Sequence, residues 1–442
     1  MEIQERCLDL AALAGDAGPD PRGRVSDMAA GLVGSEILRI AGEIRSLMAA
    51  GRSICNLTVG DFDPRYFPIP RQLAEGTLAA LEAGETNYPP SSGIAELRQA
   101  VAAFYERDLG LRYPVDSVLV AGGARPIIYC IFRALCDPGD RVVYPIPSWN
   151  NNHYIHMVGA EGVPVICGPE SRFLPTRKDL GGTLRGARLL CLNSPLNPTG
   201  TAFGRQELLE ICEAVLEENE ARVRNGERPL YVMYDQIYWM LRFGDTAHVT
   251  PPELLPEMTR YTLFVDGISK AFAATGLRVG WGVGPVDIIT RMSAVLGHVG
   301  AWAPRAEQVA TVALLNDEEG IREYQEPFKR QLQERLDLLH QGLQAMKSRG
   351  LPVDSIPSMG AIYLTARINP IGRRTPEGSE IQTNSHVRRY ILEAAGIGVV
   401  QFQAFGSTAD DGWFRMSVGA VSLAEIEAAL PRLEEALLRL ER

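Results

Sequence analysis

The sequence contains very little lysine. Only Lys178, Lys270, Lys329 and Lys347 are lysines among its 44 basic residues, so a reaction that needs a primary amine has four candidate side chains. The 54 acidic residues outnumber the basic ones and give a net charge of −10 at pH 7. A chain with this balance has no general attraction to nucleic-acid phosphates or to anionic lipids. We therefore expect no nucleic-acid partner.

Long apolar runs and paired cysteines are also absent from the sequence. No run approaches the ~18 apolar residues of a membrane span, and residues 1–21 lack the basic start and apolar core of a signal peptide. The seven cysteines are scattered and never spaced as CxxC, which argues against a disulfide framework or a zinc site. His153 and His156 have no third ligand nearby in the sequence. We expect a cytoplasmic protein with no metal and no membrane partner.

The composition is that of a folded, enzyme-sized protein. Hydrophobic residues make up 46% of the 442 residues and charged residues 22%. At roughly 100 to 200 residues per domain the chain has room for two or three domains. We expect a mobile lead-in at residues 1–31, with order beginning near Leu32, and a segment at 32–74 that packs with a small domain. The large domain is expected at 75–300, and the rest of the small domain at 301–442.

Short apolar runs alternate with helical segments through the middle of the chain. Strands that are apolar at nearly every position are covered by helices on both faces, so this rhythm predicts an α/β domain with a doubly wound, mostly parallel sheet. After Gly297 the pattern predicts long helices at 303–318 and 321–349, a few strands and a closing helix at 423–440, which together indicate a smaller α+β domain. The expected strands of the large sheet are residues 117–121, 141–145, 163–167, 187–193, 230–235, 262–267 and 279–284.

Residues suited to a binding site follow several of these strands, at the edge of the sheet where ligands collect. A turn of small residues, through which backbone N–H groups can approach a phosphate, follows the first strand. An aromatic ring, an amide, a carboxylate and a phenol follow three others. Each of these residues alone also fits a connecting turn, a core ring or a buried polar group. The residues are Gly122, Gly123, Ala124, Trp149, Asn197, Asp235 and Tyr238.

Lys270 is the one lysine that follows an apolar strand. The other three lie among charged residues, in segments that we expect to be solvated. Burial and the nearby Arg278 would lower the pKa of the Lys270 amine, as a Schiff-base lysine requires. The alternative is that the amine forms a structural ion pair with Asp266 or Asp235. Lys270 considered alone does not decide between the two.

Together, the residues at the strand ends supply the groups that are needed to hold pyridoxal phosphate. An amine would meet the aldehyde, and an arginine and a hydroxyl would join the glycine turn around the phosphate. A ring would cover the pyridine face, and polar side chains would meet the ring nitrogen and ring hydroxyl. The residues are, in that order, Lys270, Arg278, Ser269, Trp149, Asp235, Tyr238 and Asn197.

Four motifs resemble those of the class I and II pyridoxal-phosphate aminotransferases, the aspartate aminotransferase family of fold type I. They are NSPLNPTG (193–200), YDQIY (234–238), GISKAFAATGLRVGW (267–281) and RMSVG (415–419), and the resemblance runs from about Ile54 to the C-terminus. It implies that Lys270 forms the Schiff base, that Asp235 pairs with the pyridinium nitrogen, and that Tyr238 and Asn197 bond the ring oxygen.

The resemblance also implies how the remaining groups act. Trp149 would stack on the ring, and Arg415 would bind the substrate α-carboxylate with the backbone at Gly60 closing over it. Trp149 and Asn197 would contact the substrate as well. Tyr88 would reach the phosphate of a second subunit, which implies a homodimer.

The activity implied by the resemblance is the transfer of an amino group from an L-amino acid to a 2-oxo acid such as 2-oxoglutarate. Lys270 would act as general base at Cα. Aspartate or a similar donor is our first expectation, although Ala124 stands where relatives that use aspartate often carry a lysine or arginine. Arg125 follows directly and could substitute for that residue, while aromatic, alanine or other donors remain open.

Three other functions were weighed. A pyridoxal-phosphate lyase or synthase of the same fold would share the first deprotonation and stays open. The presence of Lys270, Asp235 and Arg415 together disfavours a non-catalytic regulatory relative. A nicotinamide dehydrogenase is disfavoured because the glycines at 280–284 are not spaced as GxGxxG and lie late in the chain.

Overall fold

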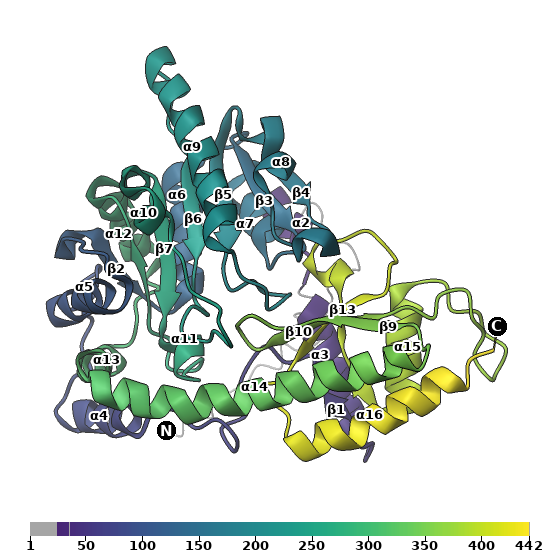
Figure 1. The fold of residues 1–442 in the computed structure, drawn as a ribbon. Helices are drawn as coiled ribbons and strands as arrows, with labels where there is room; N and C mark the ends of the chain where they lie inside the picture. The colour runs from purple at the N-terminus through teal and green to yellow at the C-terminus, as the bar shows by residue number, and fades with distance from the viewer. Residues whose placement is uncertain (1–23, 35, 442) are drawn as a thin grey trace, which may run out of the picture.

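The computed structural model describes residues 24–34 and 36–441, and its centre is a seven-stranded sheet (Figure 1). The strands run in the order β2-β8-β7-β6-β5-β3-β4. Strand β8 is antiparallel to both of its neighbours, and the other adjacent pairs are parallel. The strands are β2 (Val118–Ala121), β3 (Arg141–Ile146), β4 (Glu161–Ile166), β5 (Ala187–Asn193), β6 (Tyr231–Asp235), β7 (Thr262–Gly267) and β8 (Gly280–Val283).

Both faces of this sheet are buried, as the apolar strands predict. Neighbouring residues of one strand belong to different clusters of buried side chains. Leu119 belongs to a cluster with residues of α6, α7 and α12, whereas Val120 belongs to one with residues of α5, α9 and α13. The predicted doubly wound, mostly parallel α/β sheet is thereby confirmed. Helices of this part are α4 (Arg71–Glu82), α5 (Ala95–Leu109), α6 (Ala124–Leu135), α7 (Asn151–Val158), α8 (Arg177–Leu180), α9 (Arg205–Asn225), α10 (Pro251–Leu254), α11 (Ile268–Ala271), α12 (Val286–Val299) and α13 (Arg305–Asn316).

The smaller part of the molecule has a hydrophobic core of its own, which surrounds a four-stranded antiparallel sheet. Its strands run in the order β12-β13-β10-β9. A short parallel pair, β1 with β11, joins an N-terminal segment to it. The helices packed here include the 31-residue α14 (Glu318–Ser348), which runs alongside both parts of the molecule in Figure 1. The other elements are β1 (Cys55–Asn56), β9 (Val353–Ile356), β10 (Tyr363–Ile368), α15 (Asn384–Ala395), β11 (Ile397–Gly398), β12 (Val400–Gln401), β13 (Trp413–Ser417) and α16 (Leu423–Leu438).

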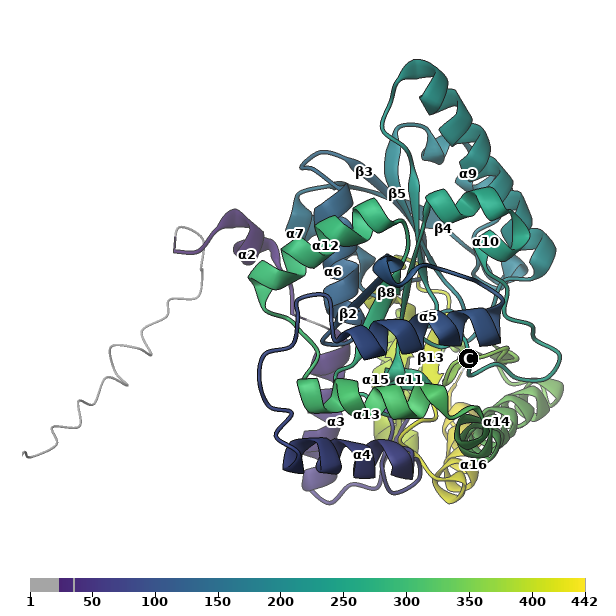
Figure 2. The ribbon, with the colours of Figure 1, turned by 90° about the vertical axis from the view of Figure 1, so that its left-hand side faces the viewer.

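Two segments before the large sheet lie on different parts of the molecule. Helix α3 (Glu36–Ala49) packs Ile40 and Ile44 with residues of the smaller part, among them Leu392 and Phe402. Helix α4, in contrast, packs on α13, and Figure 2 shows α4, α13 and α5 on one side of the molecule. The domain limits expected at residues 74 and 300 stay predictions.

Order begins earlier than expected. The structure contains a short helix α2 (Asp27–Gly31) ahead of Leu32, because the Ser26 side chain accepts a hydrogen bond from Ala29 N and caps it. His156 also contacts the Met28 carbonyl at 2.8 Å. The remainder of the expected mobile lead-in, residues 1–23, lies outside the described residues. Among the helices that are described, none is long and apolar enough to cross a lipid bilayer.

Candidate active site

A cavity of about 750 Å³ lies where the carboxyl ends of β5 and β6 face the smaller part of the molecule. The large sheet and its connections supply one wall, and residues 58–61, β10 and β13 supply the other. Predicted site residues from distant parts of the sequence meet here. Those that line the cavity are Gly60, Ala124, Trp149, Asn197, Asp235, Tyr238, Ser269, Lys270, Arg278 and Arg415.

The amine of Lys270 faces this cavity, and no described residue offers it a carboxylate partner. Its Nζ donates to the Gly60 carbonyl at 2.7 Å. Burial lowers the pKa of Lys270 to about 8, although nearby Asp61 opposes the shift. The structural ion pair with Asp266 or Asp235, which the sequence left open, is wrong: Asp266 instead accepts hydrogen bonds from neutral donors such as Trp239 Nε1 at 2.9 Å. Lys270 is therefore a buried amine with a nucleophilic, neutral form accessible near pH 8.

The carboxylate of Asp235 ends strand β6 at the same cavity. Its Oδ1 accepts a hydrogen bond from Ile237 N at 3.1 Å, and burial raises the pKa of Asp235 to about 6. The Asn193 side chain fixes the strand end by donating to the Asp235 carbonyl at 2.7 Å. A buried carboxylate with so few donors is suited to a cationic N–H partner on a ligand, which would favour its charged form.

The glycine turn after β2 packs closely against Arg278. Arg278 donates to the Gly122 carbonyl at 3.0 Å and to the Thr275 carbonyl at 2.7 Å, both neutral acceptors. Gly123 has φ 94°, and a Cβ added there would collide with the Arg278 guanidinium. Gly122 and Gly123 thus lie behind Ala124 rather than on the cavity surface, and they allow Arg278 to reach the cavity. Arg278 forms no ion pair within the described part of the chain.

Arg415 is the most buried charge of the site, with only 2% of its surface exposed. Its Nη1 donates to Asn197 Oδ1 at 3.1 Å and its Nη2 to the Thr58 carbonyl at 2.7 Å, while its Nε has no partner. Arg415 forms no ion pair with any described residue, although guanidinium groups remain charged even where burial lowers their pKa. A buried arginine held by neutral acceptors is a receptor for a small carboxylate.

Several residues at the cavity were not predicted as site residues. Tyr363, at the start of β10, places its Oη 2.6 Å from Tyr238 Oη, and burial raises the pKa of Tyr238 well above its usual value. Asp61 accepts from Thr275 Oγ1 at 2.6 Å beside Lys270. The only signal for Asp61 in the sequence was its position directly after the predicted Gly60. For Tyr363 it was the position shortly after two small residues, Gly360 and Ala361.

Arg125 and Trp149 form one corner of the cavity. The Arg125 guanidinium carbon lies 4.8 Å from the centre of the Trp149 ring. No hydrogen bond or ion pair of Arg125 occurs within residues 24–34 and 36–441. This corner therefore offers an aromatic face and an unpaired positive charge to a ligand.

Tyr88 does not reach the cavity of its own chain. It is 84% exposed, and its ring packs edge-on against Trp302 with centroids 5.4 Å apart. Its predicted role in a second subunit is untested by these contacts.

Fold and site together define a class I and II aminotransferase. The model of this family matches residues 52–433, and the chain belongs to the family. Its relatives include an aspartate aminotransferase of Rhizobium meliloti strain 1021, 31% identical over 98% of this chain and 100% of that protein. A probable aspartate/prephenate aminotransferase of Rhizobium leguminosarum bv. phaseoli is 31% identical over 90% of this chain and 95% of that one.

Solved structures agree with this family. The crystal structure of the aspartate aminotransferase from Rhizobium meliloti superimposes with a TM-score of 0.85 at 30% identity, covering 94% of this chain and 99% of that one. An aspartate aminotransferase from Thermus thermophilus with maleate gives a TM-score of 0.83 at 27% identity, covering 93% and 99%. The predicted aminotransferase and its fold are thereby confirmed.

Proposed function

We propose that the protein is a pyridoxal-phosphate aminotransferase that takes a dicarboxylic amino acid, aspartate or a close analogue, as its amino donor. The cofactor is proposed from the family and from the fit of the residues. None of the three side chains that would hold its charged or reactive groups forms an ion pair with a described residue. Arg278, beside the glycine turn, suits a phosphate, Asp235 suits a ring N–H, and Lys270 suits an aldehyde.

The residues that would hold the cofactor are those of the large-sheet wall. Lys270 would bind it covalently, Asp235 would face the ring nitrogen, Tyr238 and Asn197 the ring oxygen, and Trp149 the ring face. The phosphate would lie between Arg278, Ser269 and the turn at residues 122–124. When bound, pyridoxal phosphate supplies an electron-withdrawing ring that makes the Cα proton of an amino acid removable.

The chain's own groups would then position the substrate and move the proton. Arg415 holds the α-carboxylate by charge-assisted hydrogen bonds, which fixes the orientation of the Cα–H bond. Lys270, when released from the cofactor, accepts that proton on Nζ, because its pKa of about 8 keeps a neutral fraction near neutral pH. Tyr363 limits the motion of Tyr238 through their hydroxyl contact.

The observation that carries the dicarboxylate proposal is the unpaired charge of Arg125 at the cavity. Lys270 and four arginines (45, 125, 278 and 415) line a cavity in which the carboxylates are Asp61 and Asp235. With a phosphate at Arg278 and an α-carboxylate at Arg415, the exposed Arg45 and Arg125 remain. We assign the second carboxylate to Arg125, which lies over the Trp149 ring at the corner of the cavity. The names of the relatives, aspartate and aspartate/prephenate aminotransferases, support the same substrate class.

Replacing Arg125 by glutamine tests this assignment. With aspartate as the amino donor we expect kcat/KM to fall about tenfold, because one partly exposed charge-assisted contact is lost. With alanine as the donor, which has no second carboxylate, kcat/KM should change less than about twofold. Arg133→Gln on the same helix, with an exposed side chain outside the cavity, is the matched control. Maleate inhibition should weaken in parallel. Equal losses for both donors, or no activity with any dicarboxylic donor, would contradict the proposal.

The dimer is also a proposal. Tyr88 is exposed and does not line the cavity of its own chain, so it is free to contact the phosphate of a second subunit. Lys270→Ala lacks the amine and Tyr88→Phe lacks the hydroxyl. If sites are shared between subunits, a mixture of the two variants should be more active than the sum of both measured apart, because one site of a mixed dimer has both groups. Sedimentation at assay concentration gives the oligomeric state directly.

A further inference from the structure

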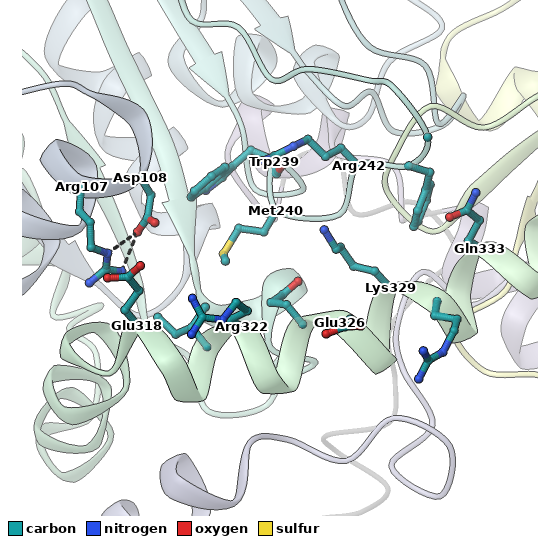
Figure 3. Close-up of a pocket in the computed structure, with 15 residues that line it drawn as sticks. Arg107, Asp108, Trp239, Met240, Arg242, Glu318, Arg322, Glu326, Lys329 and Gln333 are labelled. Carbon is teal, nitrogen blue, oxygen red and sulfur yellow. Dashed lines mark hydrogen bonds and ion pairs between the residues drawn. The ribbon is translucent and has the colours of Figure 1, made fainter.

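A second cavity of about 620 Å³ lies beside α14, and it shares no lining residue with the active site (Figure 3). One wall is the loop after β6, at residues 239–244, and the other is α14 between residues 318 and 333. In Figure 3 Lys329 points from α14 toward the loop that carries Arg242 and Met240. Five basic residues line the cavity: Arg107, Arg242, Arg322, Lys329 and Arg330. Arg242 and Lys329 approach it from opposite walls.

Neither Arg242 nor Lys329 has a described carboxylate that neutralises its charge. Within the described part of the chain no ion pair includes Arg242 or Lys329, and the hydrogen bond of Arg242 is a long one, 3.4 Å from Nη1 to the Trp239 carbonyl. Burial lowers the pKa of the half-buried Lys329, and the positive charge of Arg242 lowers it further. Two like charges in a recess repel each other unless an anion joins them.

The carboxylates around the cavity do not supply that anion. Asp108 is bound by Arg107, with Nη2 and Oδ2 2.6 Å apart. Glu318 and Glu326 line the cavity, but among the described residues neither forms an ion pair with Arg242 or Lys329. On a protein with a net charge of −10, two cations without ion-pair partners that face one cavity from different elements are positioned to attract an anion.

We propose that this cavity is a second anion site, in which a phosphate or carboxylate group of a small ligand lies between Arg242 and Lys329. Met240 and Phe243 provide an apolar wall for the rest of such a ligand. Charge-assisted contacts from both cations would hold the group.

The site lies behind the active-site cavity. Gln325 of α14 lines it and donates from Nε2 to the carbonyl of Ala271, the residue after Lys270. Trp239, on the opposite wall, follows Tyr238 in the chain. A bound anion would therefore contact elements that carry the active site, without entering it.

Calorimetric titration of the holoenzyme tests the proposal, with inorganic phosphate in one arm and succinate in the other. The variants are Lys329→Met and Arg242→Gln, and Lys347→Met on the same helix is the matched control, since its amine is paired with Asp354. Besides any anion bound at the active site, we expect one further anion per chain, whose binding either variant weakens at least tenfold and the control leaves unchanged. The arm that binds more tightly identifies phosphate or carboxylate.

A titration in which both variants bind the same number of anions per chain, with the same affinity, as the wild type, or no binding in either arm, would overturn the proposal. Because Lys329 lies outside the active site, heat lost in Lys329→Met belongs to this cavity even if the active site also takes the probe. Thermal unfolding without added anion provides the second measurement. Lys329→Met should be as stable as the wild type or more so, because a repulsion is removed. A clear loss of stability would show that Lys329 already has a compensating partner and would contradict the proposal.

Discussion

The two walls of the active-site cavity are built in different ways. The large-sheet wall gathers side chains that follow successive strands of one sheet, such as Asn197, Asp235 and Lys270. The opposite wall joins Gly60, Tyr363 and Arg415, from three segments far apart in sequence, through contacts such as that of Arg415 with the Thr58 carbonyl. The first wall is fixed by the sheet, whereas the second depends on how the smaller part packs.

The charged groups of the two walls also differ in whether they can change their protonation. Burial moves the pKa values of Asp235 and Lys270 toward neutral pH, to about 6 and about 8 respectively. Arg415 is more deeply buried and still keeps its charge, because a guanidinium does not lose its proton in proteins. The difference suggests a division of labour: the large-sheet wall holds and tunes the cofactor, and the opposite wall holds the substrate.

Among the substitutions that test the difference between the two walls, Asp235→Asn on the large-sheet wall should change the activity most. Losing the negative charge at the ring nitrogen should lower kcat by about 10³-fold, the upper range for removal of one preorganised electrostatic group. The absorbance of the bound cofactor should also shift. Spectra and kinetics of the holoenzyme measure both effects, and Asp108→Asn at the surface is the control. Unchanged kcat would show that Asp235 is only structural.

Arg415→Gln on the opposite wall should have a smaller and different effect. We expect kcat/KM to fall about 10²-fold, because charge-assisted contacts to the α-carboxylate are lost, while cofactor binding stays unchanged. Equilibrium dialysis with pyridoxal phosphate, next to steady-state kinetics, separates the two. Loss of the cofactor in this variant would break the proposed division between the walls.

The pH dependence of cofactor capture gives the smallest of these effects. The neutral amine of Lys270 is the nucleophile, so the capture rate of the apoenzyme should rise about tenfold per pH unit below the pKa and level off above about 8. An ordinary lysine would keep rising to about 10.4. Stopped-flow absorbance between pH 6 and pH 10 records the profile. A rate that still rises between pH 9 and pH 10 would contradict a buried, pKa-shifted lysine.

The contrast between the walls also explains what the sequence could predict. Strands β5, β6 and β7 match the expected residues to within one position, because buried parallel strands leave a strong apolar signal. Side chains at their ends, including Asn197 and Asp235, could therefore be placed at one edge. The same reasoning singled out Lys270, but the 2.7 Å contact of its amine with Gly60 depends on the packing of distant segments.

The opposite wall was less accessible to prediction. Strand β9 and the two-residue strands β1 and β11 carry too little periodicity to be recognised, and helix α15 was missed although Thr383 caps it and Gly396 ends it. Tyr363 reaches Tyr238 only because β10 and β6 are brought together by tertiary packing. Long-range contacts of this kind leave no local pattern in the sequence.

The central claim is that Lys270, one of four lysines, binds the cofactor covalently. Incubating the protein with pyridoxal phosphate, reducing it with borohydride and mapping the peptides by mass spectrometry tests this claim most directly. The account predicts a single modified residue, Lys270, and no label in Lys270→Ala. Label on Lys178, Lys329 or Lys347 in its place, or no label at all, would contradict it.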